Sequence, residues 1–195
     1  MIAQSDVKTY SAEEYLELEV NSQERHEYIQ GEIVLMTGGT PAHNELAINL
    51  AAFLKFSLRG QAYRTFATDQ RLSIPERDLY TYPDVMVTPK VLQLQKGRRD
   101  TICNPVMIAE VLSNSTQGYD RGEKFAAYRT LPTLQEYVLI DQYRLHVEQY
   151  VKTDTNQWLF SEYDQGEAEV SLASLPFSMT LADLYEDILL EVDGE

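Results

Sequence analysis

Two carboxylates occupy positions where an acid is costly. Glu110 lies within residues 106–112, whose other members are all apolar. An isolated buried carboxylate is strongly disfavoured, so such a residue is normally paired, protonated or bound to a cation. Asp84 repeats the pattern, because it follows Pro83 at the start of a second apolar stretch. Two strand carboxylates offer the oxygen ligands that Mg²⁺ or Mn²⁺ prefers, so the pair predicts a divalent-metal site with other positions left for water and phosphate.

A lysine on the next expected helix extends this pattern. Asp120, Lys124 and Tyr128 are spaced four residues apart, so they fall within about 80° of one another on one helix face. The helix follows the Glu110 strand after a short connection, which can fold Lys124 back toward both carboxylates. A lysine there could orient the attacking water or neutralise the charge that develops on a phosphate.

Each fragment also has an ordinary structural explanation. Glu110 could form a salt bridge or stand at a strand end, and a Pro-Asp pair is common turn chemistry. Asp120 and Lys124 have the spacing of an intrahelical ion pair. Ser113 and Ser115 follow Glu110 without evident His and Asp partners, which disfavours a serine hydrolase. The combination of the two strand carboxylates indicates a metal site more strongly than either acid alone.

Hydrophobic spacing predicts the elements that must position these residues. Expected helices start at the capping box of Ser11 and span 43–58, 117–130 and 181–190. Expected strands span 31–36, 63–74, 82–87, 106–112, 136–141, 145–152 and 157–163.

Two of these predictions bear on the site. The strand at 106–112 is apolar on both alternating faces, so we expect it to be central and covered on both sides. A turn-like segment at 75–78 separates the strands at 63–74 and 82–87, which predicts a hairpin or meander. Residues 88–104 are irregular and carry four basic residues. Loops of this length in compact domains are usually functional or mobile.

The composition predicts one globular domain over residues 1–195. No apolar run approaches the roughly 20 residues needed to cross a bilayer. The first residues lack the basic start and apolar core of a signal peptide. The single cysteine, Cys103, excludes an internal disulfide. We therefore expect a cytoplasmic protein without a membrane partner.

The net charge of −15 opposes nucleic-acid binding, because phosphate affinity depends on Lys and Arg. Its distribution weakens the objection. Residues 84–129 hold seven basic and five acidic residues, whereas eleven acids and no Lys or Arg follow Lys152. The middle of the chain, including Arg98 and Arg99, is therefore the predicted nucleic-acid surface.

The motif order resembles a known family. Pro83-Asp84, then Glu110-Val-Leu-Ser, then Asp120, Lys124 and Tyr128 is similar to the restriction-endonuclease-like Uma2 family, which is common in cyanobacteria and assigned to the PD-(D/E)XK superfamily. Two segments nearer the N-terminus are also similar to that family. Its opening segment resembles Arg25-His-Glu27-Tyr-Ile-Gln-Gly31-Glu-Ile-Val, and the helix start that follows resembles Thr40-Pro-Ala-His43-Asn.

The resemblance implies an α/β fold with a mixed, twisted central sheet flanked by helices. It also implies hydrolysis of nucleic-acid phosphodiesters, with DNA preferred to RNA as the substrate. Asp84 and Glu110 would hold Mg²⁺ or Mn²⁺. Where an E-x-K signature places lysine, this chain has Leu112, so the resemblance implies that Lys124 has taken over that role from the helix.

Two further residues are secondary candidates. Glu27 matches the family and could add a metal or water contact, although its charged surroundings are typical of a solvated face. His43 begins a helix, where a polar side chain often serves only as a cap. Asp69 is a candidate of the same rank as His43, and its structural alternative is an ion pair with Arg71.

Two other classes of function stay open at the sequence level. The acidic charge and Leu112 are compatible with a nuclease-like domain that binds nucleic acid or protein without cutting. The strands near residues 145–163 are compatible with an oligomeric structural protein, for example a homodimer.

Overall fold

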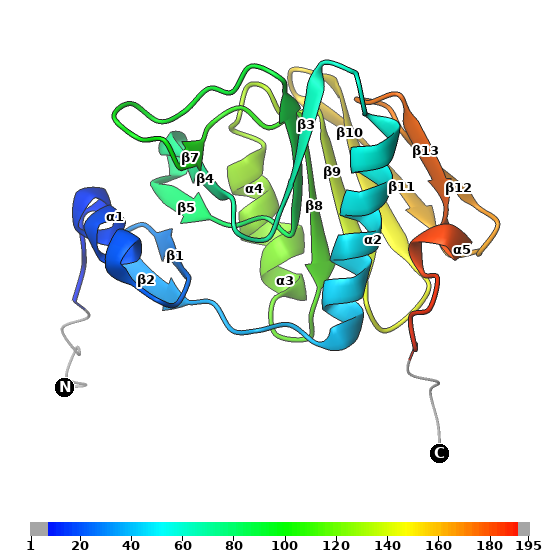
Figure 1. Ribbon diagram of the computed structural model, residues 1–195, viewed down its shortest axis with the longest axis horizontal. Coiled ribbons are helices and arrows are strands. Elements are labelled where there is room, and N and C mark those ends of the chain that lie inside the picture. The colour runs from blue at the N-terminus through cyan, green and yellow to red at the C-terminus, as the bar shows by residue number, and fades with distance from the viewer. Residues whose placement is uncertain (1–7, 191–195) are drawn as a thin grey trace.

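Three β-sheets, of six, five and two strands, and the helices packed against them make up the computed structural model, which describes residues 8–190 (Figure 1). The helices are α1 (Ala12–Asn21), α2 (Pro41–Ser57), η1 (Pro75–Arg77), α3 (Gln117–Tyr119), η2 (Asp120–Lys124), α4 (Phe125–Tyr128) and α5 (Leu181–Leu184). The strands are β1 (His26–Ile29), β2 (Glu32–Leu35), β3 (Tyr63–Ala67), β4 (Arg71–Ile74), β5 (Leu79–Thr81), β6 (Val85–Pro89), β7 (Thr101–Ile102), β8 (Met107–Leu112), β9 (Glu136–Asp141), β10 (Val147–Asp154), β11 (Gln157–Tyr163), β12 (Glu169–Leu172) and β13 (Phe177–Thr180).

The larger sheet is mixed and has the strand order β11-β10-β9-β8-β6-β3. β8 and β9 are parallel, while the other neighbours are antiparallel. Every residue of β8 and β9 is buried, as the apolar run at 106–112 predicts for a central strand. The predicted α/β architecture with a mixed sheet flanked by helices is confirmed.

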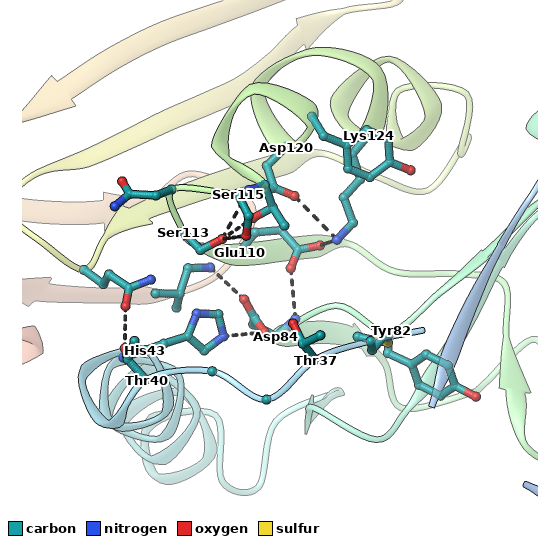
Figure 2. Close-up of a pocket in the computed structure, with 18 of the residues that line it drawn as sticks. Thr37, Thr40, His43, Tyr82, Asp84, Glu110, Ser113, Ser115, Asp120 and Lys124 are labelled. Carbon is teal, nitrogen blue, oxygen red and sulfur yellow. Dashed lines mark hydrogen bonds and ion pairs between the residues drawn. The ribbon is translucent and has the colours of Figure 1, made fainter. Parts of the chain in front are cut away.

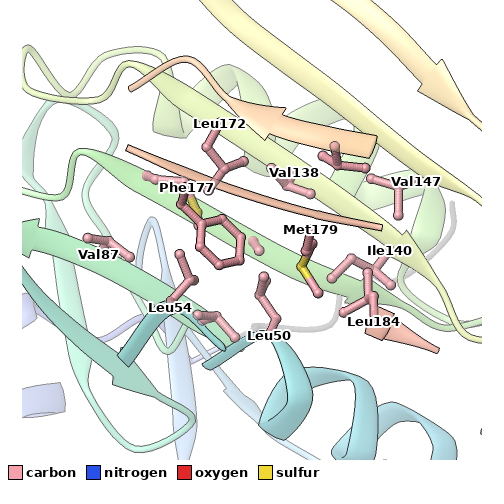
Figure 3. Close-up of a cluster of buried hydrophobic side chains, with 14 of the residues drawn as sticks. Leu50, Leu54, Val87, Val138, Ile140, Val147, Leu172, Phe177, Met179 and Leu184 are labelled. Atoms are coloured by element: carbon pink, nitrogen blue, oxygen red, sulfur yellow. The ribbon is translucent and has the colours of Figure 1, made fainter. Parts of the chain in front are cut away.

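Helix α2 covers one face of this sheet together with α5 and the β12–β13 hairpin. Thr40 caps the helix by accepting a hydrogen bond from the backbone N–H of His43, and Pro41 occupies the first turn, where no N–H partner is needed. Leu50 and Leu54 project from α2 into the core that β8, β9 and the hairpin line (Figure 3). Each buried leucine contributes about 1.5–3 kcal/mol, so this packing fixes the helix on the sheet.

The opposite face packs against the helix formed by α3, η2 and α4. Phe125 and Tyr128 from this helix pack against Ile108, Tyr137 and Leu139 of the sheet. Because side chains alternate along a strand, β8 sends Met107, Ala109 and Val111 toward α2 and sends Ile108, Glu110 and Leu112 toward this second helix. Glu110 therefore belongs to the α3–η2–α4 side.

A second sheet has the strand order β2-β1-β5-β4-β7. Several strand boundaries in the structure differ from the predicted ones. The predicted strand 63–74 is wrong as one element, because Thr68 at φ 53° turns the chain and separates β3 from β4. β3 then pairs with β6 in the large sheet, while β4 pairs with β5 in the second. The predicted strand 82–87 begins at Val85, and the strand predicted at 31–36 is one arm of the β1–β2 hairpin.

Two predicted helices also differ from the structure. The helix at 117–130 contains a π-helical turn, η2, and ends at Tyr128. The closing helix α5 ends at Leu184 rather than 190, and Asp187 has a positive φ of 63° that helical backbone excludes. Among residues 8–190 no helix is long and apolar enough to span a membrane. The prediction that the first residues do not form a signal peptide concerns a segment that lies mostly outside the described residues.

Candidate functional site

Asp84 and Glu110 lie beside each other at the end of the paired strands β6 and β8. The register of the two strands ends at the Val85–Ala109 pair, and Asp84 and Glu110 are the next residues beyond it. The Asp84 backbone N–H donates to Glu110 Oε2 at 3.1 Å, and the Val111 N–H donates to Asp84 Oδ2 at 2.8 Å. The structure thus brings together the two predicted carboxylates.

Lys124 approaches these carboxylates from the facing helix. Its Nζ lies 3.0 Å from Glu110 Oε1 and 3.5 Å from Asp120 Oδ1 (Figure 2). Glu27 Oε1 also lies 3.5 Å from the same Nζ. All three acids and the lysine are shielded from solvent, with side-chain exposures of 4–12%. The Asp120–Lys124 pair therefore exists, but as part of a buried cluster rather than as a surface ion pair.

The π-helical turn η2 carries both Asp120 and Lys124. A π turn has one more residue than an α turn, and such turns are frequent at functional sites. Both residues are buried, whereas Arg121, between them in the chain, reaches out to Glu148. Sequence spacing alone did not indicate this turn, because four-residue spacing fits an ordinary α-helix equally well.

Tyr128 also contacts the site. The sequence motif placed it on the same helix face as Lys124 but assigned it no role. Its hydroxyl is buried and donates to Glu110 Oε1 at 2.5 Å. Glu110 therefore has three protein donors, namely Tyr128, Lys124 and the Asp84 N–H. This arrangement leaves the Glu110 side chain little rotational freedom.

His43 contacts the other carboxylate from the first turn of α2. Its Nε2 lies 3.1 Å from Asp84 Oδ1. A Cβ on Gly39 would lie only 2.8 Å from the His43 ring, so glycine is needed there for the ring to keep this position. His43 is thus more than a cap residue, because its ring orients Asp84.

Gln142 connects the same helix terminus to the sheet, and no sequence pattern singles this residue out. Its Nε2 donates to the Leu112 carbonyl at 2.6 Å, and its Oε1 accepts a hydrogen bond from the Thr40 hydroxyl. Thr40 in turn accepts from the His43 N–H at 3.1 Å. The contacts run from β8 through Gln142 and Thr40 to His43, whose ring contacts Asp84 beside β8.

These residues line a cavity of about 450 Å³. Its acidic side holds Glu27, Asp84, Glu110 and Asp120 with Lys124. The other walls come from residues 34–40, the segment 113–116 and the tyrosines at positions 82, 119 and 143. All five predicted catalytic and secondary residues, including Glu27 and His43, therefore face one cavity.

The electrostatics differ between the two carboxylates. Burial raises the pKa of Glu110, and although Lys124 lowers it, nearby Asp84 and Asp120 raise it again, so that it is about 8. Burial also raises the pKa of Asp84, but the hydrogen bond and charge of His43 outweigh burial and hold it below its ordinary value. Burial lowers the pKa of Lys124, yet its acidic neighbours hold it well above the ordinary value. Lys124 is therefore charged.

The residues present fit a hard divalent cation in donor type and in charge. Four carboxylates face one ammonium in the cavity, and carboxylate oxygens are the ligands that Mg²⁺ and Mn²⁺ take. Within residues 8–190 no three His, Cys, Asp or Glu side chains are grouped so that they could hold a metal together. Asp84 and Glu110 would therefore supply two ligands, with water or a phosphate oxygen filling other positions.

Arg98 and Arg99 are not brought to the cavity. Arg98 forms a bidentate pair with Asp100 at 2.9 and 2.6 Å, and Arg99 is exposed. Asp69 also lies outside the cavity. Its predicted partner Arg71 pairs with Asp100 instead, because Asp69 points to solvent and contacts Arg25 at 3.6 Å.

The hydroxyls that line the cavity do not form a catalytic triad. Ser113 Oγ lies 3.0 Å from Ser115 Oγ and 2.9 Å from the Thr116 hydroxyl. The one histidine that lines the cavity, His43, is directed to Asp84. The structure agrees with the sequence in disfavouring serine nucleophile chemistry.

Comparison with known proteins identifies the family. The model of the Uma2 family, described as "Putative restriction endonuclease", matches residues 12–183. The chain belongs to the Uma2 family. Two Synechocystis proteins are similar along most of their lengths: sll1609 is 40% identical over 89% of this chain and 98% of its own, and slr1290 is 34% identical over 91% and 92%.

A solved structure shares the fold of this Uma2 chain. The crystal structure of an Anabaena variabilis protein, described as "a putative nuclease belonging to DUF820", superposes with a TM-score of 0.76 over 92% of this chain and 99% of that one. At 19% identity the match establishes the fold alone. The resemblance drawn from the motifs and the fold it implied are both confirmed.

Proposed function

We propose that this Uma2 chain is a metal-dependent endonuclease that hydrolyses phosphodiester bonds, with DNA as substrate. One observation carries the proposal: Asp84 and Glu110 are neighbours joined by a hydrogen bond from the Asp84 N–H to Glu110 Oε2, at the wall of a cavity that Lys124 also lines. Two carboxylates with an adjacent ammonium can bind a divalent cation and also face the charge that develops on a phosphate.

Each residue has a role in this proposal. Mg²⁺ or Mn²⁺ held by Asp84 and Glu110 would act as a Lewis acid and lower the pKa of a bound water. Lys124 stabilises negative charge on the phosphate, and Glu27 and Asp120 hold its ammonium in place. Tyr128 orients Glu110, and His43 orients Asp84. Arg98 and Arg99 would contact the nucleic-acid backbone outside the cavity.

The test is cleavage of single-stranded DNA, duplex DNA and RNA with and without Mg²⁺ or Mn²⁺. Metal-dependent cleavage should fall by at least about 10²–10³ in Asp84→Asn, because one preorganised charged group is lost. Asp69→Asn is the matched control, since Asp69 is an exposed aspartate outside the cavity. Cleavage that persists unchanged in Asp84→Asn would show that this site is not responsible.

A second candidate, binding without cleavage, has one observation in its favour. Both oxygens of Asp84 and both oxygens of Glu110 already contact protein donors. Such a site could hold its shape with no metal ion. Metal or nucleic-acid binding with no turnover on any of the three substrates would favour this candidate over the nuclease.

A further inference from the structure

The outer face of α2 carries a stripe of exposed apolar side chains. Ile48 is 61% exposed and Phe56 is 79% exposed, with the small Ala52 exposed between them. Their four-residue spacing aligns them along the helix. This stripe is on the side of α2 away from Leu50 and Leu54, which pack on the sheet.

Charged residues flank this stripe in an ordered way. Glu45 lies near the N-terminal end of α2, Lys55 lies in its last turn, and Arg59 follows in the turn after Ser57. By helical geometry Glu45 and Lys55 fall within about 60° of Ala52, on the same outer face. The face thus has an acidic end, an apolar middle and a basic end.

This arrangement is complementary to itself. In an antiparallel pair of α2 helices centred on Ala52, Ile48 opposes the partner's Phe56, and Glu45 approaches the partner's basic end, which Lys55 and Arg59 form. A two-fold axis repeats each contact, as the isologous interface of a homodimer requires. The parallel arrangement would instead place equal charges opposite each other.

We propose that a second copy of this chain docks on the α2 stripe, antiparallel and centred on Ala52. The alanine at the crossing point lets the two backbones approach closely, and Phe56 loses its exposed surface at both ends. One helix face is smaller than the roughly 800 Å² per partner of a standard interface, so the dimer dissociates in the micromolar range.

The dimer leaves each cavity intact. Every residue of the acidic cluster comes from one chain, and His43 lies nine residues from Ala52 along α2. The two His43 residues of the pair therefore lie about 27 Å apart along the helix axis, at 1.5 Å per residue. The proposal does not depend on nuclease activity, so each can fail separately.

Sedimentation equilibrium or light scattering of the full chain over a concentration series tests the proposal. The mass should rise from 22.4 kDa toward twice that value as concentration rises. Phe56→Asp should remain monomeric at every concentration. Val91→Asp is the control, because Val91 is equally exposed at 78% but lies outside α2, and it should dimerise like the unmodified chain.

Charge reversal tests the antiparallel register. Glu45→Arg and Arg59→Glu should each weaken dimerisation about tenfold, because each places like charges opposite at two symmetric positions. The double variant restores opposite charges and should regain the original dissociation constant within about threefold. A chain that stays monomeric up to about millimolar concentration, or a dimer that Phe56→Asp leaves unchanged, would overturn the proposal.

Discussion

Glu110 and Glu136 are both buried carboxylates on neighbouring strands of one sheet, yet their surroundings differ. Glu136 begins β9 and accepts hydrogen bonds only from neutral groups: the amide of Gln149, the backbone N–H of Ala173, and the N–H and hydroxyl of Ser174. Glu110 on β8 contacts the Lys124 ammonium and the Tyr128 hydroxyl, and it faces the cavity.

Burial alone therefore does not distinguish the carboxylate proposed to bind metal from a structural one. The donors of Glu136 tie the segment after β12 to the large sheet, so this acid is structural. Glu110 stands among further acids that a single lysine only partly balances, and this excess of negative charge is what a cation would offset. A charged partner and an open cavity distinguish the two sites.

The largest expected effect concerns Lys124. Lys124→Ala should lower turnover by a factor on the order of 10²–10³, because a preorganised charge is lost. Metal affinity should change little, since the two proposed ligands remain. Arg121→Ala is the matched control: Arg121 lies in the same π turn but pairs with Glu148, and its loss should leave turnover unchanged. Comparing single-turnover rates and Mg²⁺ affinities of the two variants measures the difference.

A wild-type rate for Lys124→Ala would remove the lysine from the mechanism while leaving the two carboxylates in place. Equal losses in Lys124→Ala and Arg121→Ala would instead point to a general effect on the helix.

Glu136→Gln should affect stability and not activity. The substitution replaces one acceptor oxygen by an NH₂ group that faces existing donors, which costs about 1–3 kcal/mol. For a chain of this size each kcal/mol lowers the melting temperature by about 2–4 °C. Thermal unfolding and cleavage measured on one preparation test the prediction, and a loss of turnover without a loss of stability would contradict the structural role of Glu136.

The smallest effect is expected for Tyr128→Phe. It removes one hydrogen bond to Glu110 and keeps the aromatic packing, so turnover should fall about tenfold and stability by about 1 kcal/mol. A kinetic comparison with Tyr150→Phe provides the control, because Tyr150 donates to Glu148 outside the cavity. Identical kinetics for both variants would exclude an orienting role for Tyr128.

The sequence predicted elements whose signals are local. The spacing of leucines predicted α2, and the apolar runs predicted β8 and β9, because burial on both faces leaves no alternation. The sheet partners of β3 and β4 could not be predicted, since the turn at Thr68 sends two adjacent strands into different sheets. Long-range pairing of this kind leaves no trace in local periodicity.

The sequence likewise indicated only those site residues that have a local signal. Asp84 and Glu110 have unusual residue types for their positions, so the sequence marks them, whereas Lys124 has the spacing of an ordinary helical ion pair and was singled out through the family resemblance. The motif placed Tyr128 on the same helix face as Lys124, but only the tertiary arrangement shows its hydrogen bond to Glu110. Gln142 looks like an ordinary residue at a strand end, and only the tertiary arrangement brings it between Leu112 and Thr40. The π turn at Asp120–Lys124 is likewise set by packing rather than by helix propensity.

Mn²⁺ binding, measured by electron paramagnetic resonance or calorimetry without any nucleic acid, tests whether Asp84 and Glu110 hold one cation. We expect a shared site, so Asp84→Asn and Glu110→Gln should each weaken Mn²⁺ binding by at least about 10–100-fold, which is the loss typical of even indirect ligand contacts. Glu136→Gln should bind Mn²⁺ like the unmodified chain. Unchanged Mn²⁺ affinity in both Asp84→Asn and Glu110→Gln would contradict the claim that these two carboxylates hold one cation.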